Sequence, residues 1–157
     1  MKRSIFGLLC VCVLAIAAQA QTTPPQQPAT SAGSVMRITY FDVKTGKGTE
    51  LMNFLRTNVK VILDEQKKQG LILDYMFLTK PTTDGPGDWD IAQVVVYKNY
   101  ADAIDSNPER GAKVDAIFLG HYGSAEARGK AGDLLNELRT VVSSELVRQQ
   151  ILNPMPK

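Results

Sequence analysis

Cysteine is nearly absent from this chain, and the position of the few cysteines limits the chemistry that the chain can perform. Two cysteines occur in 157 residues, Cys10 and Cys12, and both lie close to the N-terminus. After them the chain offers no thiol nucleophile, no disulfide, no Cys-ligated zinc and no iron–sulfur ligand set. Any chemistry in the remaining sequence must therefore come from other side chains.

Histidine is almost as scarce, which argues against a metal centre. His121 is the single histidine, and no H-E-x-x-H spacing occurs. Zinc sites usually need three or four His, Cys or carboxylate ligands, so we expect no metal and no dedicated cofactor. The chain also lacks a complete phosphate-binding G-x-x-x-x-G-K-[ST] loop and a G-x-S-x-G hydrolase turn.

The N-terminal segment has the three parts of a secretory signal peptide. Lys2 and Arg3 are followed by an apolar run over 5–18 and by the small-x-small pattern at 18–20. The run is shorter than the roughly 20 residues of a membrane-spanning helix. Leu9, which precedes Cys10, is not the small residue that lipidation requires. We expect residues 1–20 to be removed and the protein to be periplasmic or extracellular in a bacterium, with no stable membrane insertion.

Charge and composition place one domain after this leader. The chain has 18 basic and 16 acidic residues, and loss of Lys2 and Arg3 leaves 16 of each. A neutral domain is a poor match for nucleic acid. Residues 21–34 are rich in Pro, Gln and Thr and predict a flexible linker, so the domain should span 35–157.

Apolar periodicity predicts the elements of that domain. Strands are expected at 35–43, 71–80 and 89–97, and helices at 49–69, 100–105, 108–119 and 124–138. The segment 140–150 fits a helix or a strand, and we favour a strand. Helix breaks are expected at Gly70 and over 120–123.

The resulting order, β-α-β-β-α-β, predicts an α+β, ferredoxin-like antiparallel sheet with helices on one face. The other face should then be polar in a monomer. The first two strands instead place apolar residues on both faces, for example Met36 and Ile38 alternating with Val35 and Phe41. A second copy of the same sheet is the simplest cover, so we expect a homodimer that closes into an α+β barrel.

The element order, the two-faced strands and the YFDV…GKGTELMNFL opening resemble the dimeric α+β barrel superfamily over residues 35–150. This superfamily includes antibiotic-biosynthesis-type and haem-degrading monooxygenases, muconolactone isomerases and EthD- or NIPSNAP-like proteins. The resemblance implies a cofactor-independent oxygenase or isomerase that abstracts a proton. His121 would be the base, and Arg37 or Tyr75 would stabilise an enolate.

Haem binding through His121 is a weaker alternative that the same resemblance suggests. Haem-degrading members use an Asn near the first strand, a Trp and a His. Trp89 and His121 supply two of these residue types, but the first strand offers Arg37, Thr39 and Asp42 in place of an Asn. The chain therefore departs from the haem-degrading pattern at that position.

Aromatic and polar side chains in the strands define a candidate ligand pocket. Five aromatic residues suit an aromatic or largely apolar small molecule: Tyr40, Tyr75, Trp89, Tyr97 and Tyr122. Asp74 and Gln93 are polar positions in apolar strands, which lie either in a pocket or at a hydrated rim. The alternative is a structural or stress-response protein whose barrel is filled with side chains, and a cavity would distinguish the two.

Overall fold

The computed structural model describes residues 28–81, 85 and 88–155. The expected signal peptide and the first half of the expected linker, residues 21–27, lie outside these residues. Four strands form one antiparallel sheet in the order β2-β3-β1-β4. They are β1 (Thr30–Val43), β2 (Asp74–Thr79), β3 (Ile91–Tyr97) and β4 (Arg139–Leu152). This is the ferredoxin-like α+β arrangement that the element order predicts.

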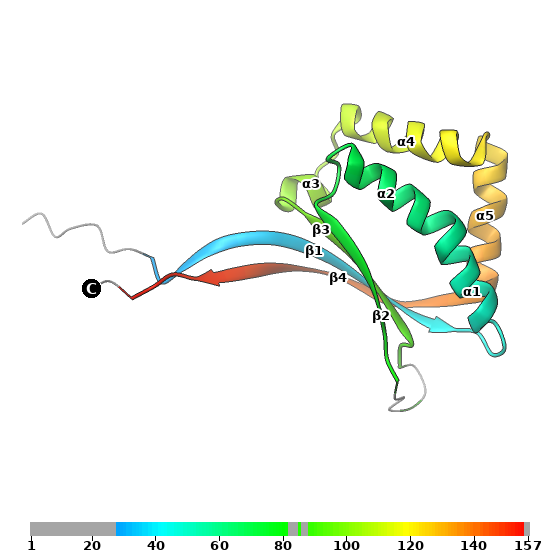
Figure 1. Cartoon of the computed structure of the whole chain (residues 1–157), viewed down its shortest axis with the longest axis horizontal. Helices are drawn as coiled ribbons and strands as arrows, with labels where there is room; N and C mark the ends of the chain where they lie inside the picture. The colour runs from blue at the N-terminus through cyan, green and yellow to red at the C-terminus, as the bar shows by residue number, and fades with distance from the viewer. Residues whose placement is uncertain (1–27, 82–84, 86–87, 156–157) are drawn as a thin grey trace, which may run out of the picture.

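The helices all lie on one side of the sheet (Figure 1). The first long helix has three parts, α1 (Gly48–Phe54), the π-helical η1 (Leu55–Val59) and α2 (Lys60–Lys68). The return to the last strand runs through α3 (Tyr100–Ile104), α4 (Pro108–Tyr122) and α5 (Ala125–Leu138). No helix among the described residues is long and apolar enough to cross a bilayer.

Local signals set most helix boundaries as the sequence predicts. The side chains of Asn99, Asn107 and Ser124 each accept a hydrogen bond from a backbone N–H in the first turn of α3, α4 and α5, respectively. The left-handed backbone of Gly123, with φ of 77°, ends α4. The break predicted over 120–123 falls at its last residue, since α4 continues through Gly120 to Tyr122. One helical glycine costs only about 1 kcal/mol, and packing against α2 outweighs it.

The strands also differ from their predicted limits: β2 begins at Asp74 and not at 71, and β3 begins at Ile91 and not at 89. β1 begins at Thr30 and not at Val35, because Thr30, Ser31 and Ala32 pair with the C-terminal end of β4. The segment 30–34 lacks the run of large apolar residues that marks a strand in a sequence, and pairing with a long partner strand imposes the extended form. The prediction that 140–150 is a strand is confirmed.

The core lies between the helices and the sheet. Its fully buried members include Val35 on β1, Leu51 on α1 and Leu138 at the end of α5. The opposite face of the sheet carries no helix (Figure 1). Strand register places on that face the mainly apolar residues Met36, Ile38, Tyr40, Met76, Leu78, Ala92, Val94, Val96 and Val147, together with the polar residues Asp74, Ser143 and Glu145. We call this set the open sheet face.

Candidate functional site

A cavity of about 380 Å³ lies between the sheet and the helices. β1 and β3 form its floor, and η1, α2, α4 and α5 form its walls. The lining is mostly apolar or aromatic, with a few polar groups: Arg37, Thr39, Phe54, Val59, Ile62, Leu63, Gln66, Gln93, Val95, Tyr97, Phe118, Tyr122, Arg128, Ala131, Gly132 and Leu135. This size and lining are typical of small-molecule sites.

The π-helical segment η1 borders this cavity. Val59, its last residue, lines the cavity, and the preceding Asn58 accepts a hydrogen bond at 3.1 Å from Nε2 of His121 on α4. Single π-helical turns inserted in α-helices are frequent at functional sites. Here the inserted turn is joined to α4 beside the cavity wall.

The polar groups of the floor come from neighbouring strands. Thr39 on β1 is paired with Gln93 on β3, and Arg37 is paired with Val95, so all of these face the helices together. Arg37 Nη2 donates a hydrogen bond of 2.6 Å to the carbonyl oxygen of Ala103 in α3. Its Nε is buried and has no hydrogen-bond partner. The guanidinium is thus held at one end and unsatisfied at the other.

The helical wall carries a second guanidinium, on α5. Arg128 Nη1 lies 2.9 Å from Asp115 Oδ1, and its Cζ lies 4.1 Å from the centre of the Phe118 ring. Burial raises the pKa of the Tyr122 hydroxyl in the same wall, and the charge of Arg128 opposes that shift. Tyr122 therefore stays protonated at neutral pH and can donate a hydrogen bond into the cavity.

Two of the residues predicted from the sequence line this cavity, Arg37 and Tyr122. Gln93, noted as a polar position in an apolar strand, lines it as well. Tyr97, one of the aromatic residues expected in a ligand pocket, also lines it, whereas Thr39, Gln66 and Arg128 were not predicted. Strand alternation could have found Thr39, because it lies on the same face of β1 as Arg37. By the same rule Tyr97 lies on the same face of β3 as Gln93. No comparable pattern marks Gln66 or Arg128.

His121 lies elsewhere, in a groove between α2 and α4. That groove is lined by charged side chains of α2, including Asp64, Glu65 and Lys68, together with His121. The imidazole packs edge-on against the Tyr122 ring, with 4.6 Å between ring centres. His121 and Arg37 therefore do not line the same cavity within one chain.

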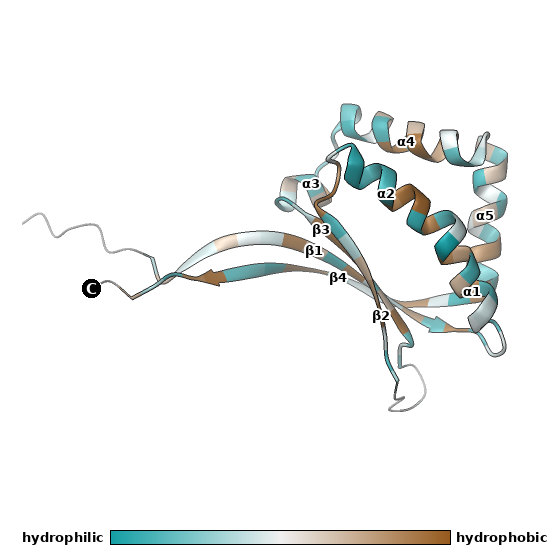
Figure 2. Cartoon of the chain, viewed as in Figure 1, coloured by the Kyte–Doolittle hydropathy of each residue, from teal (hydrophilic) through white to brown (hydrophobic). Residues whose placement is uncertain are grey.

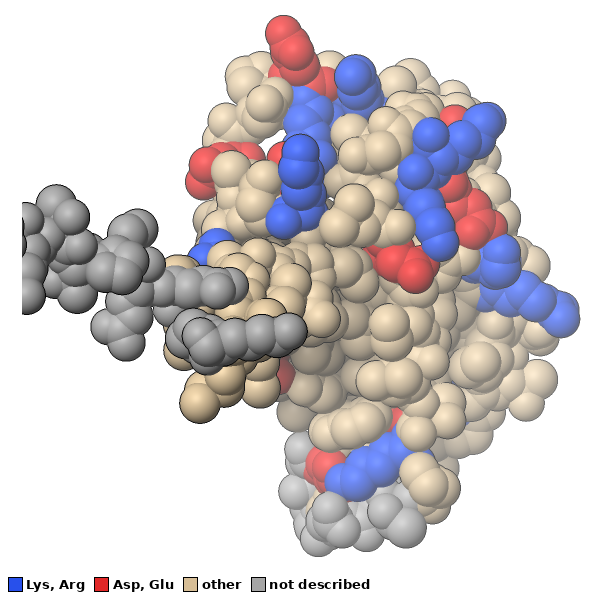
Figure 3. All heavy atoms as spheres, turned by 60° about the vertical axis from the view of Figure 1, so that its left-hand side comes forward, with Lys and Arg blue, Asp and Glu red and all other residues tan. Residues whose placement is uncertain are grey.

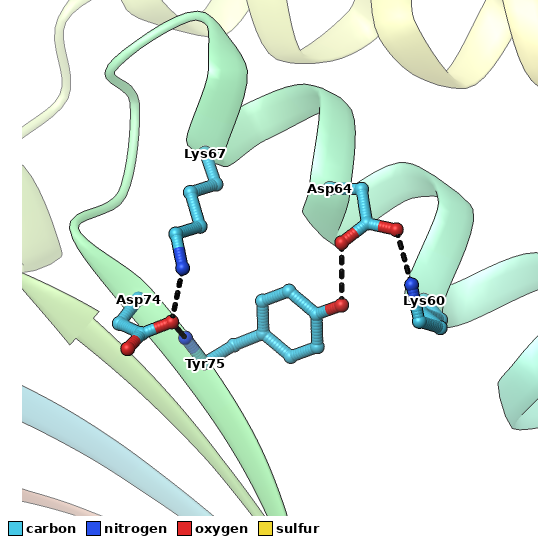
Figure 4. Close-up of polar contacts among 5 residues, drawn as sticks. All are labelled: Lys60, Asp64, Lys67, Asp74 and Tyr75. Carbon is cyan, nitrogen blue, oxygen red and sulfur yellow. Dashed lines mark hydrogen bonds and ion pairs between the residues drawn. The ribbon is translucent and has the colours of Figure 1, made fainter.

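Tyr75 and Asp74 belong to the contact between β2 and α2 (Figure 4). The Tyr75 hydroxyl donates to Asp64 Oδ1 at 2.6 Å, and Lys67 Nζ lies 2.7 Å from Asp74 Oδ1. Burial, followed by the hydrogen bond to Asp64, raises the pKa of Tyr75. The hydrogen bond from Lys67 lowers the pKa of Asp74. Tyr75 lines a third hollow, together with Met52, Leu55 and Phe77.

Tyr40 lies on the open sheet face, with Trp89 beside it. Their ring centres are 5.3 Å apart, and the Tyr40 hydroxyl donates to Glu145 Oε1 at 2.7 Å. Glu145 raises the pKa of Tyr40, mainly through this hydrogen bond. Tyr40 and Trp89 therefore belong to a different surface from the cavity that Tyr122 lines.

No group of three or more His, Cys, Asp or Glu side chains suited to a metal ion occurs within 28–81, 85 and 88–155. The cavity lining contains Arg, Gln, Thr and Tyr as its polar residue types. These are hydrogen-bond donors and acceptors for an organic molecule rather than ligands for a hard cation.

No protein-family model matches the chain, and no curated protein matches it in sequence. Several solved structures are similar in shape. One is a dimeric protein of unknown function and ferredoxin-like fold from Bacteroides fragilis, with 16% identity, a TM-score of 0.38, and coverage of 76% of this chain and 97% of that chain.

Two further solved structures also resemble the chain in shape. HapK from Hahella chejuensis has 12% identity and a TM-score of 0.39, covering 73% of this chain and 91% of that chain. A dimeric ferredoxin-like protein from an uncultured marine organism has 14% identity and a TM-score of 0.39, covering 81% and 94%. Such folds host unrelated activities, so ligand and chemistry must be argued from the residues of this chain.

Proposed function

We propose that this protein is an exported homodimer that binds a small, largely apolar molecule between its helices and its sheet. Export rests on the leader at 1–20, with Lys2 and Arg3 before the apolar run. The observation that carries the binding proposal is the cavity of about 380 Å³ with Arg37, Gln93 and Tyr122 among its polar lining. A few polar groups in an apolar cavity orient a ligand, while the walls supply contact area.

The cavity favours ligand binding over a purely structural role. A structural barrel would fill the space between its layers with side chains at the density of a protein interior. Here large side chains such as Phe54 and Leu63 line the space, yet they leave room for a molecule of drug-like size. The structural alternative therefore has to explain an unfilled space at the centre of the fold.

The open sheet face supports the homodimer. Figure 2 shows apolar stretches in the strands of the sheet. In Figure 3, charged side chains gather over the helical part of the molecule and are sparse over a broad area below it. Met76 and Leu78 on this face keep 43% and 46% of their surface exposed. A second copy of the same sheet would cover such side chains with matching ones.

The proposal assigns binding and no reaction. A base, a stabilising group and a substrate must meet within hydrogen-bond reach for proton abstraction. His121, Arg37 and Tyr75 line three different hollows of one chain. The oxygenase or isomerase chemistry suggested by family resemblance therefore has no assembled set of residues in this subunit, and haem binding through His121 would take place outside the cavity.

Native mass spectrometry of the protein purified from its own host is the direct test. We expect a dimer carrying extra mass that separates on denaturation, and that mass identifies the ligand. A dimer of bare polypeptide that also fails to take up any apolar probe would overturn the binding proposal in favour of the structural alternative.

A matched pair of glycine variants locates the binding. Gly132 on α5 lines the cavity, Gly129 on the same helix does not, and an added Cβ would meet no atom within 4 Å at either position. We expect Gly132→Leu to weaken binding of a neutral fluorophore, N-phenylnaphthylamine, by at least about tenfold by filling the cavity. Gly129→Leu should bind like wild type. Equal binding by both variants would contradict the proposed site.

A further inference from the structure

The charge of the cavity lining is one-sided. Arg37 and Arg128 line the cavity, and no Asp or Glu is among its described lining residues. A fixed positive charge within largely apolar walls attracts anions more strongly than the same charge in water, because the surroundings screen it less. The lining therefore discriminates by ligand charge as well as by shape.

Arg37 is the lining arginine whose charge has no described counter-charge. Its described hydrogen-bond acceptor is the neutral carbonyl oxygen of Ala103, at 2.6 Å, and no described carboxylate forms an ion pair with it. Its Nε is buried without a hydrogen-bond partner. A carboxylate oxygen is the acceptor that a guanidinium binds best, and a carboxylate in the cavity would give Arg37 the counter-charge that its described contacts do not supply.

A second arginine lies on the neighbouring strand, outside the described lining of the cavity. Arg148 on β4 is paired with Val35, two residues before Arg37 on β1, and faces the helices as Arg37 does. Its Nε is also buried without a partner, and its Cζ lies 4.2 Å from the centre of the Tyr100 ring. Two guanidinium groups thus lie on neighbouring strands without a described carboxylate between them.

Arg128 is less suited to the role. Asp115 lies 2.9 Å from its Nη1 and compensates its charge, and the guanidinium rests on the Phe118 ring. Phe54, Phe118 and Tyr122 in the walls and Tyr97 in the floor give the lining four aromatic rings. Rings of this kind favour a planar ligand.

We propose that the cavity binds an aromatic carboxylate, with its carboxylate on Arg37 and its ring between Phe54 and the α4 wall. This inference rests on the proposed function, since it names the ligand class of the same cavity. Gln93 and Tyr122 supply further hydrogen bonds from the floor and the wall. A neutral ligand of the same shape would leave the charge of Arg37 without a counter-charge.

Naphthoate and naphthamide of the same ring position separate charge from shape. Both should be titrated against the wild-type dimer by displacement of N-phenylnaphthylamine. We expect naphthoate to bind at least about tenfold more tightly than naphthamide, the difference that one charge-assisted hydrogen-bonded contact supplies. Equal affinities, or tighter binding of naphthamide, would overturn the inference while leaving the proposed function intact.

Two variants of Arg37 test whether this residue causes the preference for naphthoate over naphthamide. Arg37→Gln should bring naphthoate down to the affinity of naphthamide, and Arg37→Lys should keep part of the preference. Unchanged naphthamide affinity reports that the cavity of each variant is intact. Lys113→Gln removes one positive charge from an exposed position of α4 and should change neither affinity. A naphthoate preference that survives Arg37→Gln would overturn the assignment.

The two proposals fail in different ways. If the neutral fluorophore does not bind, or binds regardless of Gly132→Leu, the proposed function fails. If it binds in a Gly132-dependent manner and naphthoate shows no advantage, the inference alone fails.

Discussion

The hydroxyl of Tyr75 on the edge strand β2 donates a 2.6 Å hydrogen bond to Asp64 Oδ1 on α2 (Figure 4). The other carboxylate oxygen of Asp64 lies 2.6 Å from Lys60 Nζ. The hydrogen bond from Lys60, followed by that from Tyr75, lowers the pKa of Asp64 below its ordinary value of 3.8. This group joins the edge of the sheet to the helix that covers it.

Tyr75→Phe should destabilise the protein in a pH-dependent way. Because the pKa of Asp64 is lower in the folded state, its contribution to stability is present above the unfolded pKa and is lost as pH falls through the folded pKa. The Asp64 side chain is 49% exposed, so we expect only about 0.5 kcal/mol at pH 7 and less at acidic pH. Urea unfolding at both pH values measures it.

Tyr100→Phe is the control for this measurement, since no hydrogen bond of the Tyr100 hydroxyl occurs in the described chain. Its effect on the free energy of unfolding should not depend on acidic pH. A loss in Tyr75→Phe that is as large in acid as at neutral pH would contradict the role given to Asp64.

Met76→Lys should dissociate the dimer. The side chain lies on the open sheet face and is already 43% exposed in the single chain, so the subunit fold should survive. A charge buried in an apolar interface should raise the dimer dissociation constant by about a hundredfold. Light scattering at micromolar concentration gives the mass.

Leu134→Lys on α5 is matched to that variant, because Leu134 is 45% exposed and lies on the helical side. It should remain dimeric. A wild-type protein that is monomeric at micromolar concentration, or a dimer that Leu134→Lys disrupts and Met76→Lys does not, would refute the sheet-to-sheet arrangement.

His121→Ala should affect stability and spare ligand binding. The variant loses the 3.1 Å hydrogen bond to Asn58 in η1 and the edge contact with Tyr122, so we expect a loss of about 1 kcal/mol in unfolding free energy. His121 does not line the cavity, so affinity for N-phenylnaphthylamine should change less than threefold. A loss of affinity equal to that of Gly132→Leu would place His121 in the binding site after all. Added haem should show no Soret shift that depends on His121.

Arg139→Met should stabilise the protein. Burial lowers the pKa of Arg139, and its Nε and Nη1 are buried without hydrogen-bond partners, while its Cζ lies 3.8 Å above the Phe41 ring. Methionine keeps a long apolar side chain on that ring and removes the unsatisfied donors, which should add about 1 kcal/mol. Arg139→Ala should lose stability through lost packing. Thermal unfolding compares them, and a destabilised methionine variant would show that the cation–π contact dominates.

Local sequence signals were sufficient for the order and type of the elements. The caps at Asn99, Asn107 and Ser124, the apolar stripes of the helices and the β-branched run after Leu138 all act over a few residues. The two-faced strands likewise followed from alternation alone. Each of these features depends on contacts within one turn or one strand, so the linear sequence contains it.

Which residues line the cavity was decided by the tertiary structure. Arg37, Gln93 and Arg128 come from β1, β3 and α5, and they line one cavity because of strand register and the packing of α5 against α1 and α4. Alternation predicts which face of a strand a residue occupies, but not which residue of another strand lies opposite. Tyr40 and His121 were placed with Tyr122 by residue type, and the sheet and α4 separate them from the cavity because direction is set by packing between distant segments.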